Sequence, residues 1–246
     1  MRKGNPVESS NSVPFFERVK LAFDRYEQAG RRSNYEQAED DFRILQEQQD
    51  LKSSVERLKL KRGRRYEDCS FDNYKIECDA QQTVVDALKA YSKQPNGRNV
   101  ILFGSKGTGK DHLLMALARE VAKLQGLCVS WKNGTELHEE FRNDACGKIT
   151  HNSLFDANIC TTPILWVSDP LPPSGSLSEF QQAAWFGLVD NRYNNLLPCW
   201  ISLNVVDGAE AESRMGAQAV DRLRHGALSL KCYWESFRTR QTDDQS

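Results

Sequence analysis

The sequence predicts an α/β fold in which a five-stranded, mostly parallel sheet lies between helices and follows an α-helical N-terminal arm. Beyond Tyr66, short apolar segments of strand length alternate with segments of helical spacing. This alternation is typical of parallel sheets that are covered by helices on both faces. A glycine-rich turn also joins the first apolar segment to the helical pattern after it, as in folds that bind phosphate at the end of a strand.

Five short apolar runs are predicted to be the strands, because their length and apolar character suit strands buried in a sheet. They cover residues 99–103, 127–131, 164–167, 199–205 and 228–233. Apolar residues three and four positions apart indicate helices between them, at residues 113–124, 135–142, 177–193 and 217–223. Each predicted strand except the last is therefore followed by a helix, which is the crossover that parallel pairing requires.

The segment before this domain is predicted to form a helical arm. Apolar residues gather between Phe15 and Tyr26, and Gly30 interrupts the pattern. A second apolar stripe then runs from Tyr35 to Leu58 at helical spacing. A partner-binding arm and a solvated helix packed on its own domain both fit this narrow stripe. We expect three parts in all: the arm at residues 1–63, the sheet domain at residues 64–240, and a polar, disordered tail at residues 241–246.

Composition and charge exclude several classes of protein. The 33 basic and 34 acidic residues give a net charge of −1, so a globally basic nucleic-acid coat is excluded, whereas a local basic patch is not. The apolar runs are too short to span a bilayer, and the N-terminus has no secretory h-region. We therefore expect a cytoplasmic protein that makes no contact with a membrane.

Cysteine and arginine patterns leave two weaker possibilities. The seven cysteines include no C-x-x-C pair, which favours free thiols in a reducing compartment, and Cys146, His151 and Cys160 are the nearest approach to a metal cluster. A basic run from Arg57 to Arg65 suits either a solvated linker or a contact with nucleic-acid phosphate.

Residues 104–111 carry the clearest chemical signal. They match the pattern G-x-x-x-x-G-K of phosphate-binding loops, with aspartate where serine or threonine is usual. Glycines let backbone N–H groups turn toward phosphate oxygens, the next helix adds the positive end of its dipole, and Lys110 supplies a charge to the β- and γ-phosphates. The residues expected to bind the nucleotide are Gly104, Ser105, Lys106, Gly107, Thr108, Gly109, Lys110, Asp111 and His112.

The aspartate in this loop affects how the protein could bind the Mg²⁺ ion that accompanies ATP. A carboxylate at Asp111 is a hard oxygen ligand that can replace the usual hydroxyl, although it adds negative charge near the phosphates. A second carboxylate, Asp169, follows the predicted strand at residues 164–167 and is expected to hold Mg²⁺ as a Walker-B aspartate does. ATP and Mg²⁺ are therefore the expected cofactors, with Asp111 and Asp169 as the metal ligands.

Hydrolysis of the ATP requires a residue that orients the attacking water. ATPases of this kind usually place an acidic residue after the Walker-B aspartate, but Pro170 stands there and has no acid–base group. We expect weak hydrolysis unless Asp169, Asp111 or Glu179 orients the water. Asn204, at the end of the fourth predicted strand, suits either a contact with the γ-phosphate or its water, or a simple strand-ending turn.

The order and spacing of five segments resemble the AAA+ ATPases of the DnaC-like and IstB-like group, which comprises bacterial helicase loaders and ATP-binding helpers of transposases. The resemblance covers about residues 64–240. Its segments are the lead-in at residues 64–74, the loop and helix start at residues 104–114, Leu203 with Asn204, residues 221–224 and residues 234–238. Asp111 and Pro170 depart from the usual pattern of the family.

The resemblance implies roles for residues outside the loop. Asn204 falls where the family has its sensor-1 asparagine. Arg222 resembles an arginine finger that reaches the γ-phosphate of a neighbouring subunit, with Arg224 as the alternative, and Arg238 resembles the sensor-2 arginine that contacts the nucleotide in cis. A nucleotide held between subunits implies a head-to-tail homo-oligomer. The expected catalytic residues are Lys110, Asp169, Asn204, Arg222 and Arg238.

The leading functional hypothesis is a replicative-helicase loader, whose arm grips the helicase while the AAA+ domain binds ATP and single-stranded DNA. The candidates for a single-strand surface are the basic residues Lys132, Arg142 and Lys148 with the aromatic residues Trp131 and Phe141. An IstB-like helper of a transposase would use the same core with a different partner. A non-hydrolysing ATP-binding adaptor is the third hypothesis, and it rests on Pro170.

Overall fold

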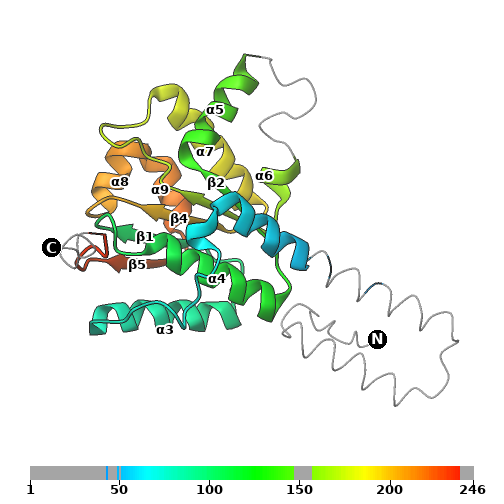
Figure 1. Cartoon of the computed structure of the whole chain (residues 1–246). Helices are drawn as coiled ribbons and strands as arrows, with labels where there is room; N and C mark the ends of the chain where they lie inside the picture. The colour runs from blue at the N-terminus through cyan, green and yellow to red at the C-terminus, as the bar shows by residue number, and fades with distance from the viewer. Residues whose placement is uncertain (1–42, 44–48, 50, 147–156, 239–246) are drawn as a thin grey trace, which may run out of the picture.

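The computed structural model describes residues 43, 49, 51–146 and 157–238, and it confirms the predicted five-stranded sheet (Figure 1). All of the strands pair in parallel, in the order β2-β3-β4-β1-β5. The strands are β1 (Val100–Gly104), β2 (Val129–Asn133), β3 (Ile164–Ser168), β4 (Cys199–Leu203) and β5 (Leu228–Cys232). Most of the predicted arm at residues 1–63 and the predicted tail at residues 241–246 lie outside the described residues.

Helices cover both faces of the sheet, as the alternating pattern predicts. They are α3 (Asp79–Lys93), α4 (Lys110–Gln125), α5 (Gly134–Ala145), α6 (Ala157–Thr161), α7 (Glu179–Asn194), α8 (Gly208–Met215) and α9 (Ala217–Arg224), with a 3-10 turn η1 (Arg64–Tyr66). Figure 1 shows α3 and α4 on one face and α7, α8 and α9 on the other. Within the described ranges, every helix is too short or too polar to cross a bilayer.

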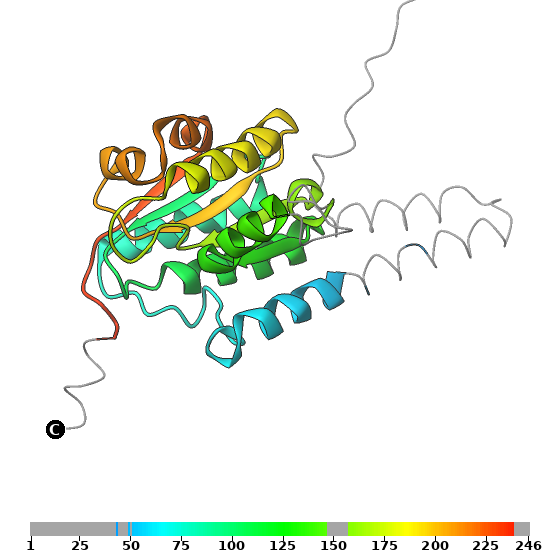
Figure 2. The ribbon, with the colours of Figure 1, turned by 90° about the horizontal axis from the view of Figure 1, so that it is seen from above.

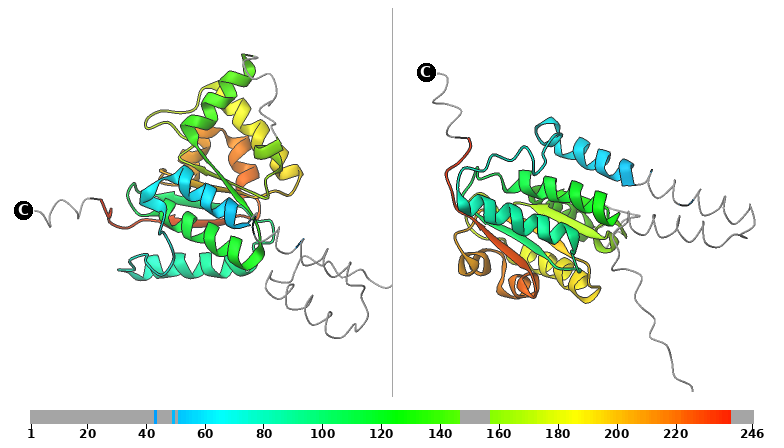
Figure 3. Two further views of the ribbon diagram at one scale, coloured as in Figure 1. Left: turned by 45° about the vertical axis from the view of Figure 1, so that its right-hand side comes forward. Right: turned by 90° about the horizontal axis from the view of Figure 1, so that it is seen from below.

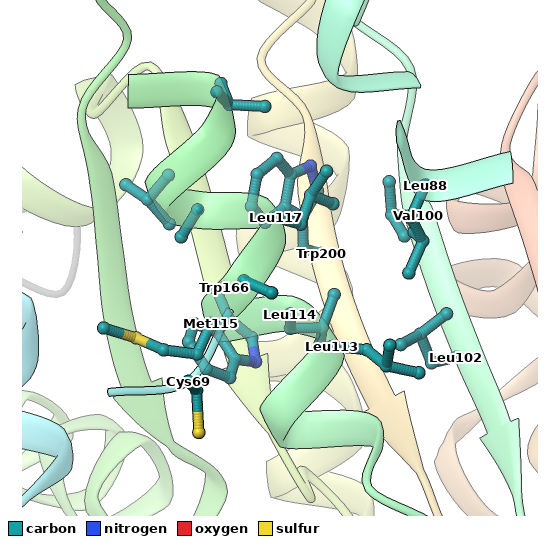
Figure 4. Packing of buried hydrophobic residues seen from close by; sticks show 14 of the residues in the cluster. Cys69, Leu88, Val100, Leu102, Leu113, Leu114, Met115, Leu117, Trp166 and Trp200 are labelled. Carbon is teal, nitrogen blue, oxygen red and sulfur yellow. The ribbon is translucent and has the colours of Figure 1, made fainter. Parts of the chain in front are cut away.

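The face under α3 and α4 is closed by a large apolar cluster. Leu117 of α4 lies beside Trp200 of β4, Leu113 of α4 lies beside Leu102 of β1, and all four side chains are fully buried (Figure 4). Buried tryptophans and leucines of this size contribute several kcal/mol each when they leave water, about 1.5–3 kcal/mol for a leucine. This cluster therefore holds α4, and with it the turn that begins α4, in a fixed place over the sheet.

A helix formed by residues 51–62 joins the same face. It lies alongside α4 when the molecule is viewed from above and from below (Figures 2 and 3). Leu58 is 4% exposed and belongs to the apolar cluster under α4. Gly63, with a φ of 83°, then ends the helix and turns the chain into η1. The described end of the predicted arm is thus packed on the domain.

The opposite face is held together by a buried arginine of α7. Arg192 has no exposed surface, and its guanidinium donates to the carbonyls of Ile159 (2.7 Å), Thr162 (3.1 Å) and Pro198 (2.8 Å). These carbonyls belong to the segments that lead into β3 and β4. One side chain therefore ties these segments together through three backbone carbonyls, of which that of Pro198 also accepts from the N–H of Leu165.

Replacing this arginine is expected to destabilise the fold strongly. Arg192→Ala removes three hydrogen bonds and leaves a space in a fully buried place, so the free energy of unfolding should fall by about 3–5 kcal/mol. Chemical denaturation followed by circular dichroism measures the change. Arg142→Ala on the exposed side of α5 is the matched control, and it should alter stability by less than about 0.5 kcal/mol. Equal stabilities of the two variants would contradict the role given to Arg192.

The register of the sheet brings the functional residues to one edge. Ser202 of β4 pairs with Leu102 of β1 on one side and with Ser168 of β3 on the other. Because the carboxyl ends of parallel strands lie at the same edge, the loop after β1 and the turns after β3 and β4 meet there. β3 runs one residue beyond its predicted end, so that Ser168 is its last residue and Asp169 stands in the turn.

Candidate nucleotide-binding site

A cavity of about 760 Å³ lies at the carboxyl edge of the sheet. It is lined by the loop after β1, the turns after β3 and β4, the lead-in before α3 and the segment after β5. The predicted residues that line it are residues 106–112, Asp169, Asn204 and Arg238. Gly104 and Ser105 are outside this lining and contribute their carbonyls to the contacts of Lys110.

The glycines of the loop allow a backbone that other residues would strain. Gly107 and Gly109 have φ values of 81° and 83°, in the left-handed region. Gly109 is also the N-cap residue that precedes α4, so the positive end of the helix dipole faces the cavity. A Cβ atom on Gly107 would lie 2.0 Å from Oγ of Ser236, and one on Gly109 would lie 2.8 Å from the ring of Tyr74.

Residues far from the loop in the sequence hold it in place through its backbone carbonyls. The hydroxyl of Tyr74 and the indole N–H of Trp234 both donate to the carbonyl of Thr108, at 3.0 and 2.9 Å. The backbone N–H of Phe237 donates to the carbonyl of Gly107 at 3.0 Å. These hydrogen bonds to the loop carbonyls therefore hold the loop in its curved shape.

The close approach of Ser236 to Gly107 leads to a prediction for the loop. Gly107→Ala is expected to displace the loop from residues 234–238 and to weaken ATP binding by at least about tenfold, because its Cβ cannot fit beside Ser236. Isothermal titration with a non-hydrolysable ATP analogue measures the affinity. Gly175→Ala is the matched control, because φ is 74° and the added Cβ meets no described atom within 4 Å. The double variant Gly107→Ala, Ser236→Gly should recover part of the loss, and an unchanged affinity in Gly107→Ala would contradict the packing argument.

Lys110 is folded back onto its own loop. Its Nζ donates to the carbonyls of Gly104 (3.0 Å) and Ser105 (2.7 Å), and the residue is 6% exposed. Burial lowers the pKa of Lys110, while the nearby carboxylates of Asp169 and Asp111 raise it. A buried ammonium with two neutral carbonyl partners is a strong candidate to pair with an anion such as a phosphate.

Asp111 makes an ion pair that the sequence does not reveal. Its Oδ2 accepts from a terminal guanidinium nitrogen of Arg62 at 2.7 Å. Its Oδ1 accepts from the hydroxyls of Ser202 at 2.7 Å and Ser168 at 3.3 Å. The carboxylate in the loop is thus neutralised by a cation from the helix at residues 51–62, rather than left to repel a nucleotide.

Asp169 and Asn204 form a second polar pair in the cavity. The side-chain amide of Asn204 donates to Oδ1 of Asp169 at 2.5 Å. Asp169 has a φ of 47°, and its N–H donates to the carbonyl of Ser202. Desolvation in the cavity raises the pKa of Asp169, Asp111 raises it further, and the cations Lys110, Arg238 and Arg62 lower it. A carboxylate of raised pKa, oriented by an amide, suits work as a general base.

The predicted arginines fall in different places. Arg238 lines the cavity, but Arg222 on α9 does not. Arg222 instead pairs with Asp190 at 3.1 Å and lies over the ring of Tyr193, and Arg224 pairs with Glu212 at 3.1 Å. Arg222 and Arg224 therefore lie on an outer helix and are not brought to the chain's own loop.

Comparison with known proteins decides the family. The family model described as IstB-like ATP binding protein matches residues 35–245, which is most of the chain. The chain belongs to the IstB-like ATP-binding protein family. The domain that contains the cavity is accordingly an ATP-binding domain, in agreement with the predicted phosphate-binding loop.

Curated relatives of this IstB-like protein carry one name. A protein named replicative helicase loader DnaC from Buchnera aphidicola subsp. Acyrthosiphon pisum (strain APS) is 29% identical over 178 residues, which is 70% of each chain. The protein of the same name from Escherichia coli (strain K12) is 25% identical over 185 residues, which is 72% of each chain.

Solved structures show the same AAA+ fold. The crystal structure of the DnaC helicase loader superposes with a TM-score of 0.62 at 22% identity, covering 69% of this chain and 99% of that one. The crystal structure of DnaI gives a TM-score of 0.58 at 19% identity, covering 71% and 93%. The replication initiator DnaA bound to AMPPCP and single-stranded DNA gives 0.56 at 17%, covering 74% and 55%. These likenesses confirm the P-loop AAA+ fold class.

The aromatic part of the predicted single-strand surface is wrong. Trp131 and Phe141 are 9% and 1% exposed and belong to the two apolar clusters, so neither ring can stack on a base. Lys132 is paired with Glu140. Lys148 lies outside the described residues, as does His151 of the Cys146 cluster.

Several other residues of the site were not predicted as site residues from the sequence. Arg62, Ser168, Ser202 and Tyr74 contact the loop, and Arg214 of α8 lines the cavity while donating to the carbonyl of Pro172. His112 lies at the cavity wall, with Nε2 2.9 Å from the carbonyl of Ser70. It therefore supports the lead-in segment as well as facing the site.

Proposed function

We propose that this protein is a replicative-helicase loader, which acts in DNA replication through nucleotide-gated contacts with the helicase and with single-stranded DNA. The observation that carries the proposal is the ATP cavity, whose loop is held by hydrogen bonds from Tyr74 and Trp234, in a chain whose curated relatives are named helicase loaders. The packed helix at residues 51–62 gives the site a physical link to the segment proposed to grip the helicase.

The side chains around Asp111 have the chemistry that a Mg²⁺ site requires. Carboxylate and hydroxyl oxygens are the ligands that Mg²⁺ prefers, and Asp111, Ser168 and Ser202 gather them within hydrogen-bond distance of one another. P-loop NTPases hold Mg²⁺ with a loop hydroxyl and a carboxylate on a neighbouring strand. In this chain the two groups have exchanged places, since the carboxylate is in the loop at Asp111 and the hydroxyl ends β3 at Ser168. When bound, Mg²⁺ would neutralise charge on the phosphates.

This exchange leaves Asp169 available to act on the attacking water instead of on the metal. Asp169 is the residue after Ser168, so it occupies the position that usually carries the water-orienting acid, and Pro170 falls one position beyond it. Its contact with Asn204 orients the carboxylate, and its raised pKa favours accepting a proton from water. We therefore assign Asp169 to water activation and expect this protein to hydrolyse ATP.

A head-to-tail homo-oligomer is the assembly that this proposal requires. Arg222 sits on an outer helix with 39% of its side chain exposed, and its partner Asp190 is also partly exposed. Such a pair contributes little to stability, so the arginine can exchange Asp190 for the phosphate of a neighbouring subunit. Light scattering with and without the ATP analogue tests whether nucleotide drives assembly.

The proposal is tested by binding to the purified replicative helicase of the same organism. We expect the full chain to form a complex with the helicase in ATP and Mg²⁺, and we expect Lys110→Ala to lose its ATP dependence. Lys123→Ala, which removes the same charge from an exposed position of α4 outside the cavity lining, should behave like the unmodified protein. A failure to bind the helicase under any nucleotide condition would overturn the loader proposal. Capture of a transposase instead would assign the same site to transposition.

A further inference from the structure

Arg62 is a buried cation delivered to the loop by the helix at residues 51–62. Only 5% of its side chain is exposed, and its guanidinium lies over three aromatic rings. The distances from its central carbon to the ring centres are 3.9 Å for Tyr66, 4.5 Å for Trp131 and 4.7 Å for Trp166. Aromatic faces attract a guanidinium, so this box holds the charge at a defined place beside the nucleotide cavity.

The charge of Arg62 is directed at one carboxylate. Its terminal nitrogens reach Oδ2 of Asp111 at 2.7 Å and, more weakly, Oγ of Ser168 at 3.5 Å. Its Nε is buried and has no hydrogen-bond partner in the part of the chain that the structure describes. The indole N–H of Trp131 also donates to Ser168 at 2.9 Å. Arg62 therefore occupies the carboxylate and the hydroxyl that the proposed Mg²⁺ site would use.

Two cations cannot share these oxygens without cost. Both oxygens of Asp111 already accept hydrogen bonds, and a divalent ion beside them would lie close to the guanidinium in a poorly solvated place. Repulsion between like charges at such a distance is strong where water is excluded. Binding of the metal at Asp111 and docking of Arg62 must therefore weaken each other, and the effect is equal in both directions.

We propose that Arg62 competes with the divalent cation of the bound nucleotide for Asp111, and that this competition couples docking of the helix at residues 51–62 to the state of the ATP site. The inference rests on the proposed binding of Mg²⁺ with ATP. In the nucleotide-free protein, Arg62 neutralises Asp111 and the helix lies on α4. Binding of ATP with Mg²⁺ displaces Arg62 and loosens the helix, which would free the arm to contact a partner.

Hydrogen exchange on the full chain tests the coupling directly. We expect the amides of residues 51–62 to be protected without nucleotide and with ATP in EDTA, and to exchange at least tenfold faster after Mg²⁺ is added. Arg62→Gln should show the fast exchange without any nucleotide. Lys61→Gln, which removes the same charge from the exposed neighbouring position, should exchange like the unmodified protein.

The metal dependence of nucleotide binding gives a second readout. In Arg62→Gln, the Mg²⁺ concentration for half-maximal binding of a fluorescent ATP analogue should fall at least tenfold relative to Lys61→Gln. In the background of Asp111→Asn, Arg62→Gln should have no such effect, because the shared carboxylate is gone. A purely structural arginine would change stability without this dependence on Asp111.

The outcomes separate this inference from the proposed function. Unchanged protection of residues 51–62 on addition of Mg²⁺, together with equal Mg²⁺ dependence in Arg62→Gln and Lys61→Gln, overturns the competition while ATP binding stands. If the unmodified protein binds no ATP with or without Mg²⁺, the ATP-dependent function and this inference both fail.

Discussion

Lys110→Ala is expected to weaken ATP binding by about 100- to 1,000-fold, the largest single loss that the site can show. The ammonium of Lys110 is almost fully buried, and its hydrogen-bond partners within the described residues are two backbone carbonyls. ATP brings phosphates to a cavity whose other nearby groups include the carboxylates of Asp111 and Asp169. Without Lys110, the phosphates would face these carboxylates with the principal positive charge of the loop removed. Titration calorimetry with the non-hydrolysable analogue measures the loss.

The control for this experiment comes from the helix that follows the loop. Lys123 of α4 carries the same charge at an exposed position outside the cavity lining, so Lys123→Ala should change the affinity by less than about tenfold. Both variants must give the same thermal unfolding midpoint within a few degrees, which excludes a folding defect. Tight ATP binding by Lys110→Ala would show that the nucleotide binds elsewhere.

Asp169→Asn is expected to reduce ATP hydrolysis by about 10²- to 10⁴-fold while changing ATP affinity only slightly. Asparagine keeps the size and the neighbours of Asp169 but cannot accept a proton from the attacking water. Steady-state phosphate release and analogue binding, measured on the same samples, separate the two effects. Asp86→Asn on α3 is the control, because it removes an exposed carboxylate from another part of the molecule. Retained hydrolysis in Asp169→Asn would assign the water to another residue, and no hydrolysis by the unmodified protein would support the adaptor hypothesis.

The pH dependence of hydrolysis offers an independent check on Asp169. Desolvation and the charge of Asp111 raise its pKa above the ordinary value of 3.8, so the base becomes protonated at a higher pH than an exposed aspartate. Hydrolysis should therefore fall as the pH decreases through this raised pKa. The same shift favours the folded state once Asp169 is protonated, since the folded protein binds that proton more tightly than the unfolded chain. Protonation of Asp169 should thus lower the activity in acid without destabilising the fold.

Much of the fold was accessible from the sequence because buried parallel strands consist of continuous apolar runs. Residues 164–167 and 199–205 predicted β3 and β4 to within two residues. The helix α3 was not predicted, although Val84, Leu88 and Tyr91 have helical spacing and are buried. The helix α8 was also missed, and its signal was the capping aspartate Asp207, which accepts from the N–H of Glu210.

The site was only partly predictable, because its missing members act over long sequence distances. Local spacing identified the loop, since its glycines, Lys110 and Asp111 are consecutive. The partner of Asp111 lies 49 residues before it in a basic run that looked like a solvated linker. The role of an aromatic residue also depends on whether it is buried, which the sequence does not show. Trp131 was therefore predicted to lie on a DNA-binding surface, whereas its buried ring packs against the guanidinium of Arg62. The sequence predicted the end of β3 only to within one residue. In the structure β3 ends at Ser168, so the hydroxyl of Ser168, and not the carboxylate of Asp169, contacts Asp111.

The hydrogen bond from Trp234 to Thr108 has a consequence for synthesis of the protein. These residues are 126 positions apart, so the loop is made long before Trp234 and Phe237, although its other donor, Tyr74, precedes it in the chain. While the chain is still growing on the ribosome, the early part of the domain lacks both β5, the edge partner of β1, and the indole N–H of Trp234. A nascent or prematurely terminated chain would therefore hold ATP poorly. Competence to bind the nucleotide then marks chains in which the whole domain has been made and folded.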